Sequence, residues 1–212
     1  MRKAFWLFFA LLLAASCELY DEDELVVDHT NGIEYDLFDI YEDCQGNKGL
    51  VINIYYRHLH GKSTGRICVL SLDEDSAYWG QNNDVFDRVP QQKFNYLVSL
   101  AQLQVAVEDG IDTYPAFKWC YQKNKRGAKD VPEIGDWLLP SSYEWYIVME
   151  NIDKINNKLS QINLTLLEDF YWCADCYSSN DALVWSPSKL QFYHTDKEKE
   201  FKVRAIRYIY YK

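Results

Sequence analysis

The sequence predicts a single α+β domain, and two observations support this prediction. Strand-like segments lie near the N-terminus and in the last third of the chain, with helical periodicity between them. In the middle, Pro140 ends a short apolar run at residues 137–139, because it fixes its own φ and favours extended geometry before it. Ser141 and Glu144 then have the spacing of a capping box, which predicts a helix start. A chain of 212 residues can bury a full core, so we expect one domain.

The first residues predict export and a lipid anchor. A positive n-region is followed by an apolar run at residues 4–15, which is too short to span a bilayer. Small residues then precede Cys17, which resembles a bacterial lipoprotein signal in which this cysteine becomes the lipidated N-terminus. The alternative is an ordinary signal peptide with an incidental cysteine. We therefore divide the chain into a lipoprotein signal peptide at 1–16, an acidic tether at 17–32 and one domain at 33–212.

Three strands are expected in the N-terminal part of the domain. Their apolar residues alternate or form short buried runs, at residues 33–41, 50–56 and 66–72. A long loop that holds His58 and His60 would join the second and third strands into a hairpin. The segment 73–80 carries three carboxylates, but their spacing does not fit a calcium loop, and we interpret it as a solvated turn.

Helices are expected in the centre of the chain and strands at its end. Apolar residues recur at helical spacing in residues 94–110. A second helix should begin at Pro115, with Asp112 or Thr113 as its cap. The helix after the capping box should divide into two near Asn151, because Asn favours helix ends. Strands are then predicted at residues 170–173, 182–185, 190–193 and 201–208.

The composition excludes one class of partner and leaves others open. The formal net charge is −10, whereas nucleic-acid binding requires a basic face, so we expect no nucleic acid. Aromatic residues make up 16% of the chain, with 17 Tyr and 7 Trp, which raises the question of what they do. Such residues serve recognition surfaces, but they also fill strand faces in β-rich extracellular proteins, and we place this structural role first.

No constellation for nucleophilic catalysis is visible in the sequence. The four His are scattered, and none lies in a Ser-His or His-Glu motif. His58, His60 and Cys68 could together bind a transition metal, although a surface hairpin explains them better. Cys173 and Cys176 could bind zinc, but no second pair has a matching spacing. We therefore predict no catalytic residue, no metal and no cofactor.

The cysteine count predicts that one thiol stays outside intramolecular disulfides. After acylation of Cys17, five cysteines would remain, which is an odd number. Export to an oxidising compartment favours disulfides among them. At least one thiol would then be free or would pair between molecules.

An ordered set of motifs resembles a known bacterial family. The motifs lie at residues 137–141 with Glu144, then 153–156, 171–172, 182–185 and 203–207. Their letters and order resemble the C-terminal domain of bacterial collagen-like adhesins, the Lcl C-terminal domain family. Segments at 49–51, 69–73, 79 and 116–120 are similar to the N-terminal half of that family. The resemblance covers about residues 33–208.

The resemblance implies a variant of the C-type-lectin-like fold, with small antiparallel sheets, flanking helices, and N- and C-terminal strands that lie close together. Cys173 and Ala174 depart from the family pattern, in which serines follow the Tyr-Trp pair. The calcium signatures of sugar-binding lectins are also missing, so calcium-dependent sugar binding is not implied. Because the family's fold places the two segments beside one core, we expect a disulfide from Cys120 to Cys173 or Cys176.

The anchor and the resemblance together predict a lipoprotein of the bacterial outer membrane that is exposed at the cell surface. Its domain would be a non-catalytic recognition or adhesion module for a glycan or protein ligand, with the membrane as its other partner. The candidate ligand-binding residues are aromatic side chains near loops, at Trp79, Tyr177, Tyr193 and His194, although each alone is more often a packing residue. Two alternatives stay open, a structural subunit of a surface assembly and a cysteine-based modifying enzyme related to formylglycine-generating enzymes.

Overall fold

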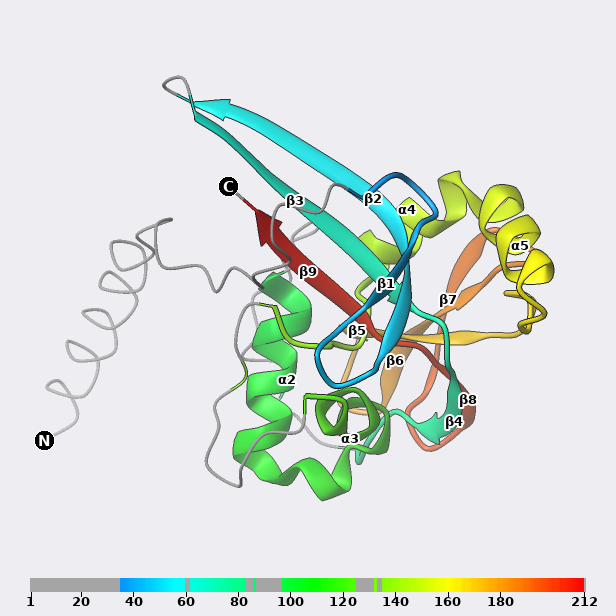
Figure 1. Ribbon diagram of the computed structural model, residues 1–212. Coiled ribbons are helices and arrows are strands. Elements are labelled where there is room, and N and C mark those ends of the chain that lie inside the picture. The colour runs from blue at the N-terminus through cyan, green and yellow to red at the C-terminus, as the bar shows by residue number, and fades with distance from the viewer. Residues whose placement is uncertain are drawn as a thin grey trace, which may run out of the picture.

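The computed structural model describes residues 35–59, 62–82, 86, 97–124, 132 and 135–211 (Figure 1). The predicted signal peptide, the acidic tether and Cys17 lie outside these residues. None of the described helices has the length and apolar character needed to cross a membrane.

Two β-sheets form the body of the domain (Figure 1). The first is antiparallel and has the order β1-β2-β3-β9, with strands β1 (Ile40–Glu42), β2 (Lys48–Leu59), β3 (Lys62–Ser71) and β9 (Ile206–Tyr211). The second has the order β4-β8-β5-β6-β7, with strands β4 (Asp75–Tyr78), β8 (Glu200–Val203), β5 (Tyr171–Cys176), β6 (Asp181–Ser186) and β7 (Gln191–Asp196). In this sheet the β5–β8 pair is parallel and the other pairs are antiparallel.

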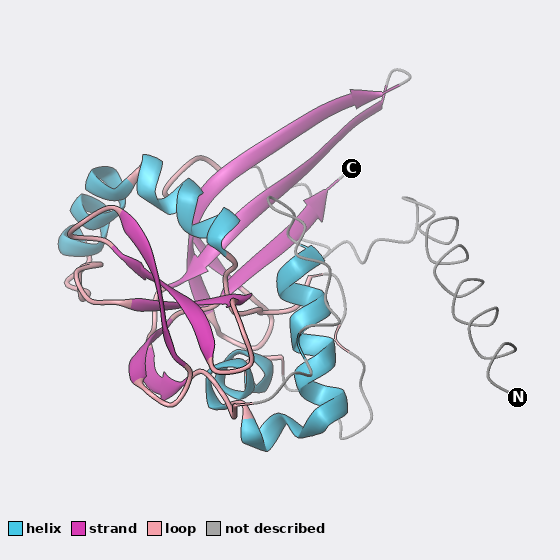
Figure 2. Ribbon diagram, turned by 180° about the vertical axis from the view of Figure 1, so that it is seen from behind, coloured by secondary structure: helices cyan, strands magenta, loops and turns pink. Residues whose placement is uncertain are grey.

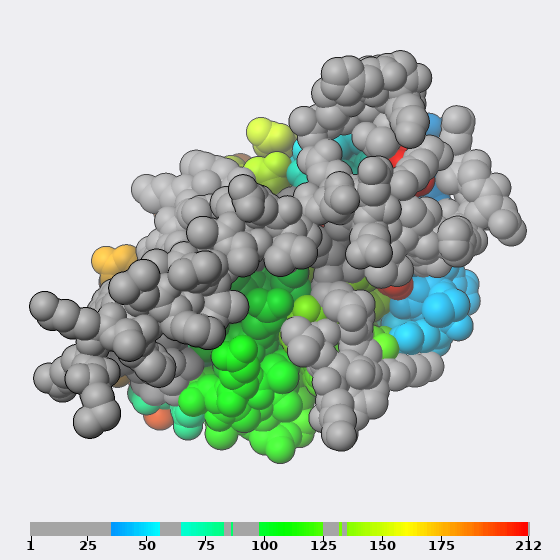
Figure 3. Space-filling view, turned by 90° about the vertical axis from the view of Figure 1, so that its left-hand side faces the viewer, coloured from blue at the N-terminus to red at the C-terminus, as the bar shows by residue number. Residues whose placement is uncertain are grey.

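Helices pack around the two sheets (Figure 2). They are α2 (Leu97–Gly110), the 3₁₀ turn η2 (Ile111–Thr113), α3 (Pro115–Gln122), α4 (Ser142–Glu150) and α5 (Ile152–Gln161). Helix α4 contacts both sheets, through β2 of the first and through β5 and β6 of the second. Helices α2 and α3 contact the second sheet at β5 and β4, and the outer side of α2 lies at the surface in Figure 3. The fold is therefore α+β, as the sequence predicts.

The segment around Pro140 joins the two sheets, and its predicted features are confirmed. Leu138 and Ile206 exchange backbone hydrogen bonds of 2.8 Å, and the carbonyl of Pro140 accepts the amide of Ala174 at 2.7 Å. The first bond pair reaches β9 and the second reaches β5. Helix α4 then begins with the predicted capping box at Ser141 and ends at Asn151, before α5.

The last predicted strand, at residues 201–208, is wrong as a single element. β8 ends at Val203 in the second sheet, and β9 begins at Ile206 in the first. Between them the chain changes sheets. The Ser71 amide donates to the Ala205 carbonyl at 2.8 Å, and the Ala205 amide donates to the Ser71 hydroxyl at 2.9 Å. The apolar positions alternate as far as Ala205 and shift by one residue at Ile206, where the chain enters the first sheet.

Two expectations for the N-terminal strand are also corrected. β1 and β9 lie at opposite edges of the first sheet, with β2 and β3 between them, so the terminal strands are not neighbours. The strand predicted at 33–41 is confined to Ile40–Glu42, while residues 33 and 34 lie outside the described part of the chain. Phe38 has a φ of 72°, a turn conformation that breaks the extended geometry.

The predicted hairpin of β2 and β3 is confirmed but has a shorter loop. β2 extends to Leu59 and β3 begins at Lys62, so His58 lies in a strand rather than in a long loop. His60 lies outside the described residues. Figure 1 shows the two strands extending as a ribbon beyond the body of the domain.

Two local predictions in the middle of the chain need correction. The segment 73–80 contains the strand β4, at an edge of the second sheet, and is not a solvated turn. Helix α3 begins at Pro115 as expected, but its N-cap is Tyr114, which makes no side-chain capping bond. Asp112 and Thr113 belong to η2 instead.

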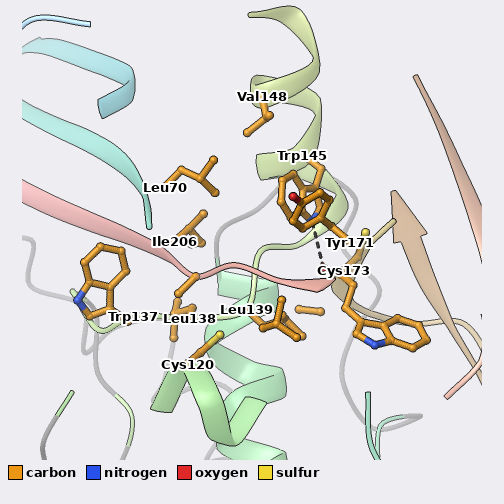
Figure 4. Close-up of a cluster of buried hydrophobic side chains, with 14 of the residues drawn as sticks. Leu70, Cys120, Trp137, Leu138, Leu139, Trp145, Val148, Tyr171, Cys173 and Ile206 are labelled. Carbon is orange, nitrogen blue, oxygen red and sulfur yellow. Dashed lines mark hydrogen bonds between the residues drawn. The ribbon is translucent and has the colours of Figure 1, made fainter. Parts of the chain in front are cut away.

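Aromatic side chains form much of the core between the sheets and α4 (Figure 4). Trp145 of α4 stacks on Trp185 of β6 with ring centroids 4.7 Å apart, and its indole N–H donates to the carbonyl of Trp172 at 3.1 Å. Trp137, Leu138 and other residues of the central segment are buried beside them. The structural role of the aromatic residues therefore accounts for most of the Trp content.

Candidate recognition surface

The two arginines of the motif at 203–207 are held in ion pairs inside the domain. Arg204 is fully buried, and its guanidinium donates to Glu74 at 2.9 Å and to the Ser71 carbonyl at 3.0 Å. Arg207 lies 3.1 Å from the carboxylate of Asp43. Both arginines therefore serve the fold, and neither is available to a ligand.

Asp43 is the centre of a second buried network. Its carboxylate accepts the indole N–H of Trp137 at 2.9 Å and the side-chain amide of Asn47 at 2.8 Å. Burial raises the pKa of Asp43, but the hydrogen bonds from Trp137 and Asn47 outweigh burial and leave the pKa below its ordinary value. Asp43 is thus an ionised structural residue that ties the central segment to the first sheet.

Two carboxyl groups lie at the N-terminus of α4, the fully buried Glu144 and the partly buried Asp175. Glu144 accepts the amide of Ser141 at 2.8 Å and the hydroxyl of Tyr208 at 2.7 Å, and it also accepts the Ser141 hydroxyl. Asp175 of β5 accepts the amide and hydroxyl of Ser142, at 2.6 and 3.0 Å. Burial raises the pKa of both carboxyl groups, and these hydrogen bonds offset only part of that effect. Both groups accept hydrogen bonds from residues at the start of the helix.

The predicted disulfide from Cys120 to Cys173 or Cys176 is not formed in this structure. Cys120 and Cys173 are free, buried thiols, and Cys176 donates its S–H to the carbonyl of Ser178 at 3.0 Å. Figure 4 shows the sulfur of Cys120 beside Leu138 and that of Cys173 near Tyr171, with other core side chains between them.

The environment of Cys173 also argues against a cysteine-based enzyme. Burial raises the pKa of the Cys173 thiol well above its ordinary value, and the nearby carboxyls of Asp175 and Glu144 raise it further. The thiolate is the reactive form of cysteine, and Cys173 has no exposed surface through which a substrate could reach it. The described residues also contain no group of three His, Cys, Asp or Glu that could hold a metal ion.

Trp79 is a core residue, so the expectation that it contacts a ligand needs correction. Its side chain has no exposed surface, and its indole N–H donates to the carbonyl of Cys173 at 2.8 Å. The ammonium group of Lys197 lies 4.9 Å from its ring, and the ring of Phe117 lies at 4.9 Å. The neighbouring Tyr78 is the exposed one, because side chains alternate along β4.

Two other predicted residues, Tyr177 and His194, are brought together at the surface. Their rings stack with centroids 4.4 Å apart and an interplanar angle of 9°. Tyr177 is 56% exposed, and His194 is exposed on β7. Tyr193, which was also predicted to bind ligand, lies on the opposite face of β7, and its ring is 6.0 Å from that of Phe170.

The face of β7 that carries His194 continues as an aromatic surface that the sequence alone did not reveal. Phe192 lies two residues away, on the same face, and its ring is 4.8 Å from that of Tyr146 of α4. Tyr146 is 40% exposed. We call Tyr146, Tyr177, Phe192 and His194 the β7 surface. The alternation of residues 191–196 was the signal for Phe192, but the packing of Tyr146 against it depends on the tertiary fold.

Two carboxylates lie at one end of the β7 surface. Asp181 of β6 and Asp196 of β7 are directly opposite each other in the strand register, which places both on the face of His194. Asp181 accepts the hydroxyl of Ser178 at 3.4 Å, and Asp196 accepts the amide of Glu198 at 2.9 Å. Within the described part of the chain, neither carboxylate has a cationic partner. Like charges directly opposite across a sheet repel, so a cation at this point would stabilise the pair.

An open groove of about 460 Å³ lies at the other edge of the second sheet, beside β4. Its lining residues come from the end of β4, from the start of α3 and from the turn after β7, and they are Tyr78, Gly80, Gln81, Thr113, Pro115 and Glu198. Tyr78 is 52% exposed, which is close to the exposure of Tyr177. The groove therefore offers a second exposed tyrosine on the same sheet for comparison with the β7 surface.

No family model matches the chain, and no curated protein matches it significantly. A fimbrial protein from Bacteroides ovatus has a solved structure that is similar over 66% of this chain, with a TM-score of 0.49 and 15% sequence identity. The matched region spans 35% of that protein, so this chain corresponds to about a third of its length.

Proposed function

We propose that this protein is a lipoprotein of a bacterial outer membrane, anchored through Cys17, whose domain recognises a glycan or protein ligand without catalysis. The ordered motifs at residues 137–207 support a place in the Lcl C-terminal domain family and a variant of its C-type-lectin-like fold. The lipoprotein-like signal before Cys17 supports export and surface exposure. The opposite-edge positions of β1 and β9 are a departure from what that family implies.

The observation that supports recognition most strongly is the exposed stack of Tyr177 and His194. Aromatic faces that stay accessible to solvent are typical contacts for sugars and protein partners. The ionisable groups inside the domain, such as Glu144 and Arg204, are held by hydrogen bonds to other parts of the chain. The ligand is therefore expected at the β7 surface, and no reaction is expected there.

Tyr177→Ala is expected to weaken ligand binding by at least ~1 kcal/mol, about fivefold in Kd, because it removes an accessible ring and the partner of His194. The measurement is a titration of full-length protein against hits from glycan and matrix-protein arrays. Tyr78→Ala is the matched control, since Tyr78 is 52% exposed on the opposite edge of the same sheet. Equal binding by Tyr177→Ala and parent, with loss in Tyr78→Ala, would move the site to the β4 groove.

The anchor has its own test. Mass spectrometry of the membrane fraction is expected to find an N-terminal peptide that begins at Cys17 and carries acyl chains. Two or three acyl chains hold a protein stably on a membrane, so Cys17→Ser should release the protein into the soluble fraction. An intact signal peptide, or a cleaved chain without lipid, would contradict the proposed anchor.

A further inference from the structure

We propose that the ligand of the β7 surface is an extended peptide segment of a partner protein, which adds to the second sheet as a new strand beside β7. This inference rests on the proposed recognition function and names the class of ligand. It follows from the backbone of β7, from the side chains along one of its faces and from the charge at one end.

The backbone groups of Phe192 and His194 point away from β6, toward the open edge. The amide of Lys197 donates to the carbonyl of Asn180 at 2.9 Å, which fixes the phase of the β6–β7 ladder. Hydrogen-bonded pairs alternate in an antiparallel ladder, so residues 191, 193 and 195 bond to β6, and residues 192 and 194 do not. On the other side of β6, the amide of Tyr177 donates to the carbonyl of Asp181 at 2.9 Å, which gives the same phase.

The edge at β7 differs from the edges that β1, β4 and β9 form. β1 has three residues and β4 has four, and such short edge strands discourage pairing. β9 is covered in part, because Leu138 pairs with Ile206 and the guanidinium of Arg207 donates to the Gly135 carbonyl at 2.6 Å. β7 has six residues, Gln-Phe-Tyr-His-Thr-Asp, and contains neither Lys nor Pro. It lacks the usual protection of an edge strand against pairing.

The side chains on one face of β7 define what an added strand would carry. Phe192, His194 and Asp196 occupy every second position of β7. Phe192 lies beside Tyr146, His194 beside Tyr177, and Asp196 opposite Asp181. Residues opposite them in an added strand would also be two apart. If the peptide runs antiparallel to β7, its first matching residue lies opposite Asp196 and should be basic. The next lies opposite His194 and should be aromatic, and the third lies opposite Phe192 and should be apolar. One residue separates each of these from the next.

Charge favours a basic peptide over a second copy of this chain. The carboxylates of Asp181 and Asp196 would pair with the basic residue of the peptide. Each copy of the protein has a formal net charge of −10, so two copies repel each other at this edge. The occupant is therefore a segment of another protein.

The test uses synthetic peptides and the unaltered full-length protein. The library has the pattern Thr-Lys-Thr-Z-Thr-J-Thr, in which Z is Tyr or Phe and J is Val, Ile or Leu, and fluorescence polarisation measures binding. N-methylation of the best peptide at Z removes an amide that faces β7, and binding should weaken at least about tenfold. N-methylation at the Thr before Z removes an amide that points away from β7, and binding should stay within about twofold. Replacing Lys by Glu should weaken binding about tenfold in low salt.

The outcomes distinguish a failure of the strand-addition proposal from a failure of the proposed recognition function. Equal effects of the two methylations, or no binding by any member of the library at millimolar concentration, would overturn strand addition. Array binding that depends on Tyr177 would then still support recognition of another ligand class. Concentration-dependent dimers of the protein alone, dissociated by the peptide, would assign the edge to a second copy and overturn the choice of occupant.

Discussion

Arg204→Ala is expected to lower the free energy of unfolding by about 3–5 kcal/mol, the usual cost of breaking a buried ion pair from one side. Arg204 has no exposed surface, and its guanidinium bonds Glu74 at 2.9 Å, the Ser71 carbonyl at 3.0 Å and the Thr165 carbonyl at 3.2 Å. The substitution leaves the Ser71 and Thr165 carbonyls without this donor, and Glu74 keeps the Tyr171 hydroxyl and Lys202 as partners. It also leaves a cavity where the chain crosses from one sheet to the other.

Urea denaturation at neutral pH measures this effect, and Lys48→Ala is the matched control. Lys48 pairs with Glu42 at 3.2 Å, but both side chains are about half exposed, at 55% and 54%. Removing an exposed pair costs roughly 0–1 kcal/mol. A loss of less than ~1 kcal/mol in Arg204→Ala would show that the buried pair does not hold the sheet crossing together.

Glu144→Ala is expected to cost about 3 kcal/mol, because it orphans donors at a buried helix end. The amide of Ser141 and the hydroxyl of Tyr208 both lose their acceptor, and neither is accessible to water. Glu144→Gln keeps the volume of the side chain and removes its titration. The difference in the free energy of unfolding between this variant and the parent therefore reports how titration of the Glu144 carboxyl affects stability.

The stability advantage of the parent over Glu144→Gln should shrink as pH rises. Burial raises the pKa of Glu144 above its ordinary value of 4.5, so the folded protein keeps a proton that the unfolded chain releases. The parent therefore loses stability from about pH 4.5 upward, until the buried group itself ionises. Denaturation curves at pH 4.5, 6 and 7.5 measure the difference. A difference that is constant or grows with pH would contradict the raised pKa.

Local features of the fold were predictable from the sequence because they depend on neighbouring residues. The capping box at Ser141 and the joint at Asn151 follow from side chains within one helical turn. The sheet crossing at Arg204 was not predictable, because it depends on Glu74, which lies 130 residues away. The apolar alternation shifts by one residue between Ala205 and Ile206, but this shift alone does not show that the chain enters another sheet.

The candidate site was predictable only in part, for a related reason. Tyr177 and His194 were identified as aromatic residues near loops, and the fold stacks them. Trp79 was misassigned because β4 was interpreted as a turn, which hid the alternation that buries Trp79 and exposes Tyr78. Tyr146 and the Asp181–Asp196 pair depend on helix packing and strand register, which a single sequence does not specify.

Hydrogen–deuterium exchange with and without ligand tests the location of the site most directly. The measurement uses full-length protein and the tightest hit from the arrays, and it needs no variant. Ligand is expected to slow exchange in residues 177–183 and 190–196, around the β7 surface, and to leave residues 78–82 and 113–115 unchanged. Protection confined to residues 78–82 and 113–115 would place the ligand in the β4 groove and contradict recognition at β7.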